Sequence, residues 1–494
     1  MCIRDSFSTL ILLLCNYFLI GQINFDSNWI FGNSGGVRLS FNDDSVTVQN
    51  IDLNFDINSG SAVISNKQGV LQFFTNGCEI KNRNYEVMLN GDSIGLPGNP
   101  FCSNGNFNPL VNSTVIVPSE INEEIYYNLH IGFTADATDT ASLYLTTVDM
   151  SKDNGLGAVV EKKEFIFSDY FSRYGMEMTR HANGQDWWVI IPQFESNCYH
   201  TLLFDEGEFV YDTLQCIGQK WDHADLQYQH DFSPDGQRYA RFSHNQGMNL
   251  LDFDSETGLF SEPIRIDFGF TEEFFHAGVI FSPNSRFVYA SAFDNIFQFD
   301  LEALDVSESR IKIATLSTPD SIMFRTRFSR GFLAPNSKIY IGGTFQFNHL
   351  HVIHYPDCKG LDSNPEQYAI RLGEFPHSSS QGVPNIPHFR NQPQDINCDT
   401  VQITVSTQSP SKTEGIKHTL SPNPSSSEIE ISIPNITSSY TVEFYDLLGE
   451  KILTSESESA KKKIDVSNLT AGMFFYTITA KGQVIGQGKF LKVE

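Results

Sequence analysis

The chain has 494 residues, of which 59 are acidic and 33 are Lys or Arg, so its formal net charge at pH 7 is −26. This charge argues against nucleic acid and against an anionic membrane surface as partners. The length allows more than one domain, and an aromatic share of 13% with 41 phenylalanines is typical of a protein built from many short strands.

An apolar stretch from Phe7 to Ile20 lies near the start of the chain. It is too short to span a membrane and has the length of the hydrophobic region of a secretory signal peptide. Gly21 is a small residue suited to the position before a cleavage site, so we expect residues 1–21 to be removed and no membrane span to remain. Residues 1–6 carry one positive and one negative charge, and they resemble a spurious leader placed ahead of a natural start.

The cysteines that follow the predicted signal peptide are even in number, which predicts disulfides in an exported protein. Many pairings are open to them, and the order along the chain favours joining neighbours, because each pair then falls within one repeat or closes one. None of these pairs has CxxC spacing, so zinc binding and thioredoxin-like chemistry are not expected. The favoured pairs are Cys78–Cys102, Cys198–Cys216 and Cys358–Cys398.

A strand–turn–strand phrase recurs along the next part of the chain. In its clearest copy, Phe232–Gly236, Pro234 presets φ for a tight turn and Gly236 supplies the positive φ. Repeats of about 40–50 residues that each contain several short strands are the signature of a β-propeller. Further copies of the phrase start at Phe281 and Leu333, and looser ones at Ile64, Val115 and Arg180.

The repeats predict an all-β fold with a roughly seven-bladed β-propeller over residues 22–400. The strands at 28–32 and 37–41 have no turn phrase of their own. We expect them to complete the last blade together with residues 382–389, because pairing the two ends of the chain closes the ring. The other blades are expected at about 60–95, 112–165, 176–215, 228–268, 276–313 and 326–373.

The composition changes after Cys398. Residues 401–419 are rich in Ser, Thr and Gln and predict a linker. Residues 420–494 hold about seven short alternating strands, from Ile429–Ile433 to Lys489–Val493, which predict a small Ig-like β-sandwich.

Several phrases of the repeat region resemble secreted propellers of the Bacteroidota that are associated with gliding motility and type IX secretion. The resemblance covers about residues 29–390 and departs from the family pattern at Gly77–Glu79. It implies a propeller and export, but no particular activity. The matching phrases are Asn76–Gly77, Lys81–Met88, Asn90–Gly91, Val148–Ser151, Gly155–Gly157, His181–Gly184, Asp186–Val189, Leu350–Ile353 and Gly382–Asn385.

The tail resembles the type A sorting domain of the type IX secretion system. Its motifs occur in order at the C-terminus, and they contain Pro422, Asn423, Pro424, Leu448, Gly449, Gly472 and Lys489. The resemblance implies that these residues form a sorting signal, and that the type IX machinery reads it after passage through the periplasm. The body would then be secreted or attached to the outer cell surface. Lys489 and Lys492 would place charged side chains on the last edge strand.

Two histidine-rich stretches could suggest metal or acid–base sites. Around Asp231 we favour polar contacts within a blade. In the second stretch a strand places His349 and His351 on one face and His354 on the other, so one metal cannot easily use all three. The first stretch contains His223, His230, His244, Asp222, Asp225 and Asp231.

Three further patterns have structural interpretations. Asp252–Gly258 lacks the spacing of an EF-hand loop and predicts a hairpin turn. Trp187–Trp188 and Phe274–Phe275 could stack on sugars, but at least one member of each pair is expected in the core. Short triplets that resemble O-glycosylation acceptors of the Bacteroidota start at Asp139, Asp212 and Asp399.

The sequence contains no hydrolase or nucleotide-binding motif, and it singles out no catalytic residue, metal ligand or cofactor. We therefore expect a non-catalytic binding module for a surface glycan or a protein. The alternative is a propeller hydrolase that acts on polysaccharide or peptide. An enzyme should show converging carboxylates or a His-centred cluster in the channel, whereas a binder should show an exposed aromatic patch at one mouth of the ring.

Overall fold

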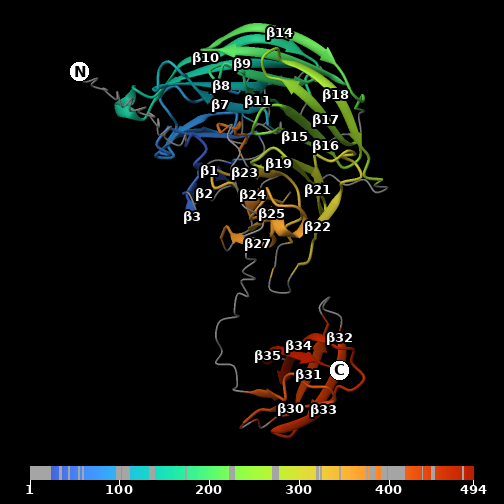
Figure 1. The fold of residues 1–494 in the computed structure, drawn as a ribbon. Coiled ribbons are helices and arrows are strands. Elements are labelled where there is room, and N and C mark those ends of the chain that lie inside the picture. Colours follow the sequence, from blue (N-terminus) through green and yellow to red (C-terminus); the bar gives the residue numbers. More distant parts are fainter. Residues whose placement is uncertain are drawn as a thin grey trace, which may run out of the picture. The chain divides into compact units, whose positions relative to one another are not determined.

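The computed structural model describes residues 24–32, 36–42, 45–53, 56–57, 60–95, 102, 112–132, 140–172, 175–221, 228–269, 277–318, 322, 325–343, 346–373, 377–378, 384–390, 398, 418–434, 436, 438–446, 451–480 and 483–493. The predicted signal peptide and most of the predicted linker lie outside these residues. The chain divides into two units, Met1–Ile403 and Thr404–Glu494, and each is considered by itself (Figure 1).

Seven antiparallel sheets follow one another along the first unit, which confirms the predicted propeller. We number them blades 1 to 7. The first two are three-stranded: β1 (Asn28–Phe31), β2 (Gly36–Phe41) and β3 (Val46–Ile51) form blade 1, and β4 (Ala62–Ser65), β5 (Leu71–Thr75) and β6 (Ile80–Asn82) form blade 2.

The other five blades are four-stranded. Blade 3 contains β7 (Thr114–Pro118), β8 (Ile125–Gly132), β9 (Ala141–Asp149) and β10 (Ala158–Asp169), and blade 4 contains β11 (Glu177–Arg180), β12 (Trp187–Pro192), β13 (Cys198–Asp205) and β14 (Glu208–Cys216). Blade 5 contains β15 (Tyr228–Phe232), β16 (Arg238–Ser243), β17 (Gly247–Asp254) and β18 (Leu259–Ile266). Blade 6 contains β19 (Ala277–Phe281), β20 (Phe287–Ala292), β21 (Asn295–Asp300) and β22 (Ile311–Thr315). Blade 7 contains β23 (Gly331–Leu333), β24 (Ile339–Ile341), β26 (His349–Ile353) and β27 (Pro365–Arg371).

A short pair, β25 (Gln346–Phe347) and β28 (His377–Ser378), and two 3-10 turns, η2 (Asp153–Gly155) and η3 (Gly360–Ser363), complete the described elements of the first unit. No helix in the described part of the chain has the length and hydropathy that a membrane crossing needs.

The recurring turn phrase forms the hairpin between the first two strands of blades 5, 6 and 7. In blade 5 the amide of Gly236 donates to the carbonyl of Ser233 (2.8 Å), and Gly236 has a φ of 70°. Ser285 and Ser337 hold the equivalent positions with φ values of 61° and 60°. This left-handed conformation is easiest for glycine, and it produces the strand–turn–strand geometry that the sequence predicts.

Neighbouring blades pack face to face through large apolar side chains. Along β12 every residue is buried, because both faces of the strand lie against other parts of the ring. The first strands of successive blades contact one another at the centre, as seen for β1 and β4, β4 and β7, β15 and β19, and β19 and β23. Blade 7, drawn in orange, lies beside blade 1, drawn in blue (Figure 1), and side chains of the two blades share one hydrophobic cluster.

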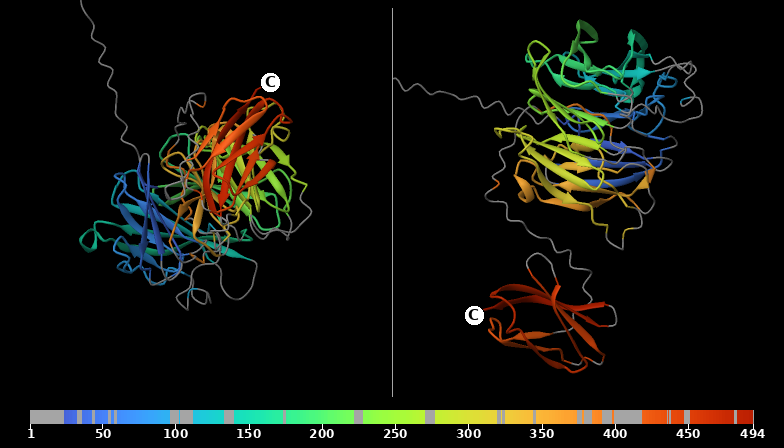
Figure 2. Two further views of the ribbon diagram at one scale, coloured as in Figure 1. Left: turned by 90° about the horizontal axis from the view of Figure 1, so that it is seen from below. Right: turned by 90° about the vertical axis from the view of Figure 1, so that its right-hand side faces the viewer.

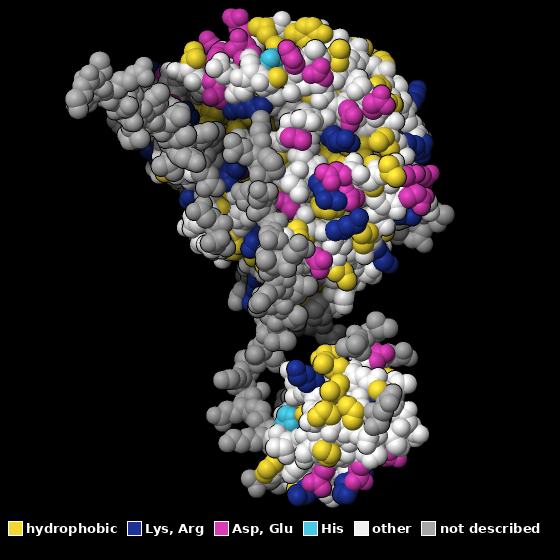
Figure 3. Space-filling view, viewed as in Figure 1, with side chains coloured by type: hydrophobic (Ala, Val, Ile, Leu, Met, Phe, Trp, Pro, Cys, Tyr) yellow, Lys and Arg dark blue, Asp and Glu magenta, His cyan; other side chains and the backbone are white. Residues whose placement is uncertain are grey.

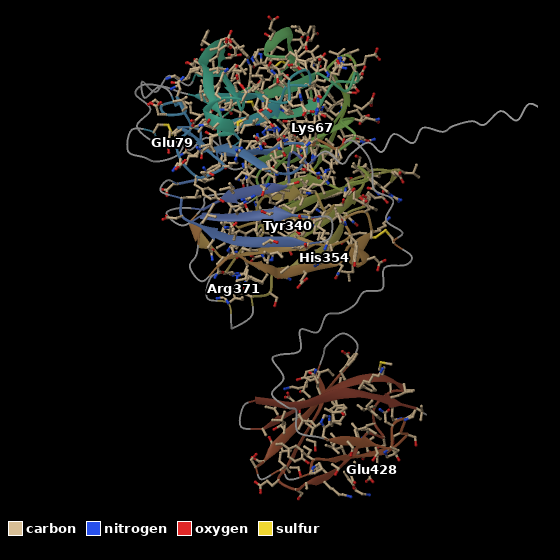
Figure 4. All side chains as sticks on the ribbon, turned by 90° about the vertical axis from the view of Figure 1, so that its left-hand side faces the viewer. Lys67, Glu79, Tyr340, His354, Arg371 and Glu428 are labelled. Carbon is tan, nitrogen blue, oxygen red and sulfur yellow. A yellow bond between two sulfur atoms is a disulfide. The ribbon has the colours of Figure 1, made fainter. Side chains whose placement is uncertain are left out.

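The ring closes differently from the prediction. Strands β1–β3 form a complete sheet of their own, because β2 pairs with β1 on one side and with β3 on the other. Residues 384–390 belong to no sheet. Blade 1 meets blade 7 through side chains instead: the ring of Trp29 lies 6.3 Å from that of Phe332 and 5.7 Å from that of Tyr340. Figure 4 labels Tyr340 in blade 7. The predicted shared blade is therefore wrong.

All three favoured disulfides are present, so the predicted pairing is confirmed. The Cα–Cα distances are 5.4 Å for Cys78–Cys102, 3.9 Å for Cys198–Cys216 and 5.4 Å for Cys358–Cys398. The second bond joins directly paired residues of β13 and β14. The third bond ties the chain that follows the ring back to blade 7.

The second unit is a two-sheet β-sandwich, as predicted. Alternate residues Ile429, Ile431 and Ile433 point into its core, where they meet Phe444 and Phe490. One sheet has the order β29-β30-β33 and the other β32-β31-β34-β35, so β35 is an edge strand. The strands are β29 (Thr419–Ser421), β30 (Glu428–Ser432), β31 (Tyr440–Tyr445), β32 (Lys451–Ser457), β33 (Lys461–Asp465), β34 (Gly472–Ala480) and β35 (Gln483–Lys492).

Candidate functional site

Carboxylates converge at the centre of the ring, where the first strands of the blades meet. Glu177 comes from β11, Asp231 from β15, and Asp26 from the turn ahead of β1. Glu177 and Asp231 are each only 6% exposed. This is the place where the alternative reading, a hydrolase, would need its acid and base.

Residues 384–390, which we call the strap, run through this centre. The amide of Asn385 donates to the carbonyl of Ser61 at the start of blade 2 (2.9 Å), and its side-chain Nδ2 donates to the carbonyl of Met176 ahead of blade 4 (3.1 Å). His388 Nε2 lies 3.0 Å from Asp231 Oδ1 in blade 5. The strap therefore contacts blades on different sides of the ring.

The end of the strap binds two further blades. The Arg390 guanidinium donates to the carbonyl of Pro335 in blade 7 (2.5 Å) and to Asp26 Oδ1 ahead of blade 1 (3.2 Å). The ring of Phe389 packs 5.6 Å from Trp187 of blade 4. Blades 1, 2, 4, 5 and 7 are thus joined through one extended segment.

Other polar side chains connect the blades directly. Arg330 Nη1 donates to Asn112 Oδ1 (3.0 Å), which links blade 7 to the residues ahead of blade 3. Gln229 Nε2 donates to the carbonyl of Gly331 (2.8 Å), while its Oε1 accepts from the amides of Val279 and Gly331 (3.2 Å each). Gln229 therefore ties blade 5 to blades 6 and 7.

The central cluster holds protons more tightly than free side chains do. Burial, together with the charge of Asp231, raises the pKa of Glu177 well above its usual value. Burial also raises the pKa of Asp26 and of Asp231. Burial alone would lower the pKa of His388, but the nearby charges of Asp231 and Asp26 outweigh it and raise that pKa. All four shifts favour the protonated forms.

Little room remains around these groups. Two cavities of about 20 and about 30 Å³ border the strap. The smaller one is lined by Trp29, Glu177, Asp231 and His388, among others. A cavity of this size has room for one or two water molecules. The converging carboxylates that an enzyme requires are present, but neither of these two cavities, which described residues line, has room for a sugar ring or a peptide.

The structure describes only some residues of the first histidine-rich stretch, namely His230, Asp231 and His244. His230 Nδ1 lies 3.0 Å from the hydroxyl of Tyr239, its partner within blade 5, and His244 is buried. Asp231 reaches across blades instead, accepting from the amide of Phe281 (3.1 Å) as well as meeting the strap. His223, Asp222 and Asp225 lie outside the described residues.

The second histidine stretch divides between two faces, as predicted. His349 and His351 both contact the ring of Tyr368, with centroids 5.7 and 4.9 Å away, whereas His354 Nε2 lies 2.7 Å from Glu366 Oε2. Burial lowers the pKa of His351 to about 4. Among the described residues, no group of three His, Cys, Asp or Glu side chains is arranged to hold a metal.

The acidic loop Asp252–Gly258 is a hairpin turn between β17 and β18, as predicted, with Asp254 accepting from the amide of Glu256 (2.9 Å) and the hydroxyl of Thr257 (2.8 Å). Trp187 and Trp188 are both 2% exposed, so neither offers a sugar platform. Each faces a different neighbouring blade, which is why both are buried. Phe274–Phe275 lie outside the described residues.

Among the described residues of the first unit, the exposed large aromatic side chains lie on the outermost strands of blades 3 and 4 and just after blade 3, and not at a mouth of the ring. Phe165, Tyr170 and Tyr211 are 58%, 53% and 42% exposed. We call these residues, together with the exposed Val210 and Leu214 of β14, the rim group; Phe165 lies beside Tyr144 in blade 3, and Tyr211 lies beside Trp188 in blade 4. Their strands project at one end of the first unit (Figure 2), and acidic side chains lie among apolar ones there (Figure 3). The sequence showed these residues only as ordinary strand positions.

Asn423 connects the first sorting motif to the last strand of the sandwich. Its Nδ2 donates to the carbonyl of Lys489 (2.9 Å), and its Oδ1 accepts from the amide of Leu491 (2.9 Å). Ser425 continues this contact, with its amide donating to the carbonyl of Leu491 (3.1 Å). The loop thus covers part of the open edge of β35, which is where unpaired backbone groups would otherwise be exposed.

The other predicted sorting residues are spread over the domain. Pro422 and Pro424 flank Asn423 and are exposed, Gly472 begins β34 opposite Lys492, and Lys489 is exposed on β35. Lys492 is only 6% exposed, so it does not mark the edge as Lys489 does. Leu448 and Gly449 lie outside the described residues.

Comparison with known proteins identifies the tail. Residues 419–492 match the family model described as a secretion system C-terminal sorting domain. The chain therefore carries a type IX sorting domain, and it is exported to the outer surface or secreted. No curated protein sequence matches the chain.

Solved structures resemble the chain only distantly. A protein of unknown function from Desulfotomaculum acetoxidans is 12% identical with a TM-score of 0.40, and the match covers 73% of this chain and 99% of that one. A putative 6-phosphogluconolactonase from Bacteroides fragilis is 10% identical with a TM-score of 0.37, covering 72% and 98%. The β-propeller domain of a Myceliophteria thermophila protein is 9% identical with a TM-score of 0.34, covering 65% and 93%.

Proposed function

We propose that the protein is a non-catalytic binding module, delivered to the outer cell surface or the medium, whose propeller holds a neutral glycan on the rim group. The observation that carries the proposal is the strap, because the chain's own residues fill the part of the ring where a substrate would have to bind. No cofactor or metal is part of this proposal.

The strap argues against the hydrolase alternative. A glycosidase of either stereochemistry needs two carboxyl groups on opposite sides of a bound sugar. Here Asp231 is paired with His388 of the strap, and Asp26 with Arg390. The cavities beside these pairs hold water-sized molecules only. The acidic groups at the centre therefore serve to hold the ring together.

The rim group supports a neutral glycan as ligand. Exposed aromatic rings offer flat apolar faces with a polar tip, and carboxylates such as Asp212 nearby can accept hydrogen bonds from sugar hydroxyls. The net charge of −26 would repel an anionic polysaccharide. The secretion machinery is the other partner, through the sorting domain.

A glycan array probed with residues 22–400 tests the proposal. We expect binding to neutral glycans, and we expect the double variant Phe165→Ser/Tyr170→Ser to weaken it at least about tenfold, since two stacking contacts are lost. Ile121→Ser is the matched control, because Ile121 is 83% exposed but outside the rim group. Its binding should equal that of the unmodified protein.

Three outcomes would count against the proposal. Unchanged binding by the double variant would show that the rim group is not the site. An array without any bound glycan would rule out this ligand class. Release of new reducing ends from a polysaccharide would show that the protein is a hydrolase.

A further inference from the structure

We propose that the strap is a clasp that closes the propeller from the inside, and that the proton on His388 is part of what keeps it closed. The inference concerns the stability of the ring and does not depend on what the rim group binds. It follows from the position of the strap between blades, the two ion pairs that hold it, and the set of charges around His388.

The strap takes the place of a sheet shared by the two ends of the chain, which this ring lacks. In a ring whose first and last blades shared a sheet, backbone hydrogen bonds would join the chain ends. Here blade 1 and blade 7 are separate sheets, joined by side chains such as Trp29 and Tyr340. The strap supplies polar connections instead, since its Arg390 reaches both Asp26 ahead of blade 1 and Pro335 of blade 7.

His388 holds the middle of the strap to the far side of the ring. Its Nε2 lies 3.0 Å from Asp231 Oδ1, and Asp231 Oδ2 accepts from the amide of Phe281, so the carboxylate is fixed between blades 5 and 6. A protonated imidazole in this position makes a buried ion pair. Loss of the proton would leave the Asp231 carboxylate buried without its opposite charge, which is unfavourable.

The charged and titratable groups around His388 come from every element that packs on it. Asp231 and His230 lie on β15, Glu177 on β11, Asp26 ahead of β1, and Arg390 on the strap itself. Arg330 at the start of β23 acts on Glu177. The groups nearest His388 are carboxylates, and their negative charge favours the imidazolium.

The raised pKa values determine whether the ring gains or loses stability as the pH rises. The pKa of His388 is raised in the folded protein, so its stabilising contribution is complete below its usual pKa of about 6.5 and is lost as the pH rises above that value. The pKa of Glu177 is also raised, and its ionisation beside Asp231 acts in the same direction. The ring should therefore become less stable as the pH rises above about 6.5.

Thermal unfolding of the full chain, followed by tryptophan fluorescence, tests the clasp. All four tryptophans lie in the first unit, at positions 29, 187, 188 and 221, so the signal reports the propeller and not the sorting domain. We expect the Tm of the unmodified protein to fall as the pH rises from 7 to 9. A Tm that stays level or rises over this range would overturn the proposal without any variant.

Variants distinguish the contribution of His388 to the pH dependence of the Tm from that of other titrating groups. His388→Asn should lower the Tm at pH 7 and reduce its pH dependence, with the part due to Glu177 remaining. Arg390→Met should lower the Tm at both pH values while the pH dependence remains. His354→Asn is the control, since His354 pairs with Glu366 away from the strap and should leave the slope unchanged. A slope in His388→Asn equal to that of the unmodified protein would refute the clasp, as would an unaltered Tm in Arg390→Met.

Discussion

Removal of residues 418–494 is expected to leave a folded propeller that stays in the periplasm. These residues form the whole of the described sandwich, with a hydrophobic core of their own, and they include the matched sorting domain. The first unit has its own core and all three disulfides. Export across the outer membrane should fail completely, because the signal that the type IX machinery reads is missing.

Cell fractionation with an antibody against the propeller measures this effect. The full-length protein should appear on the surface or in the medium, and the shortened protein should appear in the periplasmic fraction. The tryptophan-monitored Tm of the two purified proteins should agree, which shows that loss of export is not loss of folding. Surface exposure of the shortened protein would contradict the assignment of the sorting domain.

Trp29→Ala should destabilise the propeller by about 3–5 kcal/mol, because it empties a large buried site. Trp29 is 1% exposed and sits where blade 1 meets blade 7, in edge-on contact with Phe41, Phe332 and Tyr340. A typical stability is about 5–15 kcal/mol, so the loss would be a large share of the total. Urea unfolding, followed by the fluorescence of the other three tryptophans, gives the change in midpoint.

Two matched substitutions show whether the effect belongs to the seam between the blades. Trp29→Phe keeps most of the contact area and should cost much less than Trp29→Ala. Leu304→Ala removes a fully exposed side chain and should change the midpoint very little. If Trp29→Ala were as mild as Leu304→Ala, the seam would not close the ring.

Much of the fold could be predicted from the sequence because its signals are local. The turn phrase around Pro234 fixes φ and leads into alternating strands, so each copy identifies a hairpin without knowledge of the rest of the ring. The alternation of Ile429, Ile431 and Ile433 likewise identifies a sandwich strand. The disulfides followed chain order because each joins residues within one blade or returns to the last blade.

The closure of the ring could not be predicted because it depends on contacts between distant residues. The strand Val46–Ile51 is largely exposed and weakly apolar, so it was not recognised as the third strand of blade 1. A blade that holds only β1 and β2 needs a partner from elsewhere in the chain, which is why the sequence predicts a shared last blade. The strap has no strand periodicity, and the hydrophobic pattern of Pro384–Arg390 does not indicate that it enters the centre of the ring.

The central site was only partly visible for the same reason. Asp231 stood out beside the turn phrase, but its partner His388 lies 157 residues further along the chain. Glu177 resembles any acidic residue at the start of a strand. A usable signal was the placement of two basic residues, His388 and Arg390, in a proline-punctuated segment of an otherwise strongly acidic chain.

Hydrogen–deuterium exchange of the full chain at pH 7, measured on peptides that cover residues 384–390, tests the filled channel most directly. If the strap is packed inside the ring, with the Asn385 amide bonded to Ser61, that amide should exchange as slowly as those of the buried strand β15. Complete exchange of this segment within seconds, while β15 remained protected, would show that the channel is open, and the case against a hydrolase would fail with it.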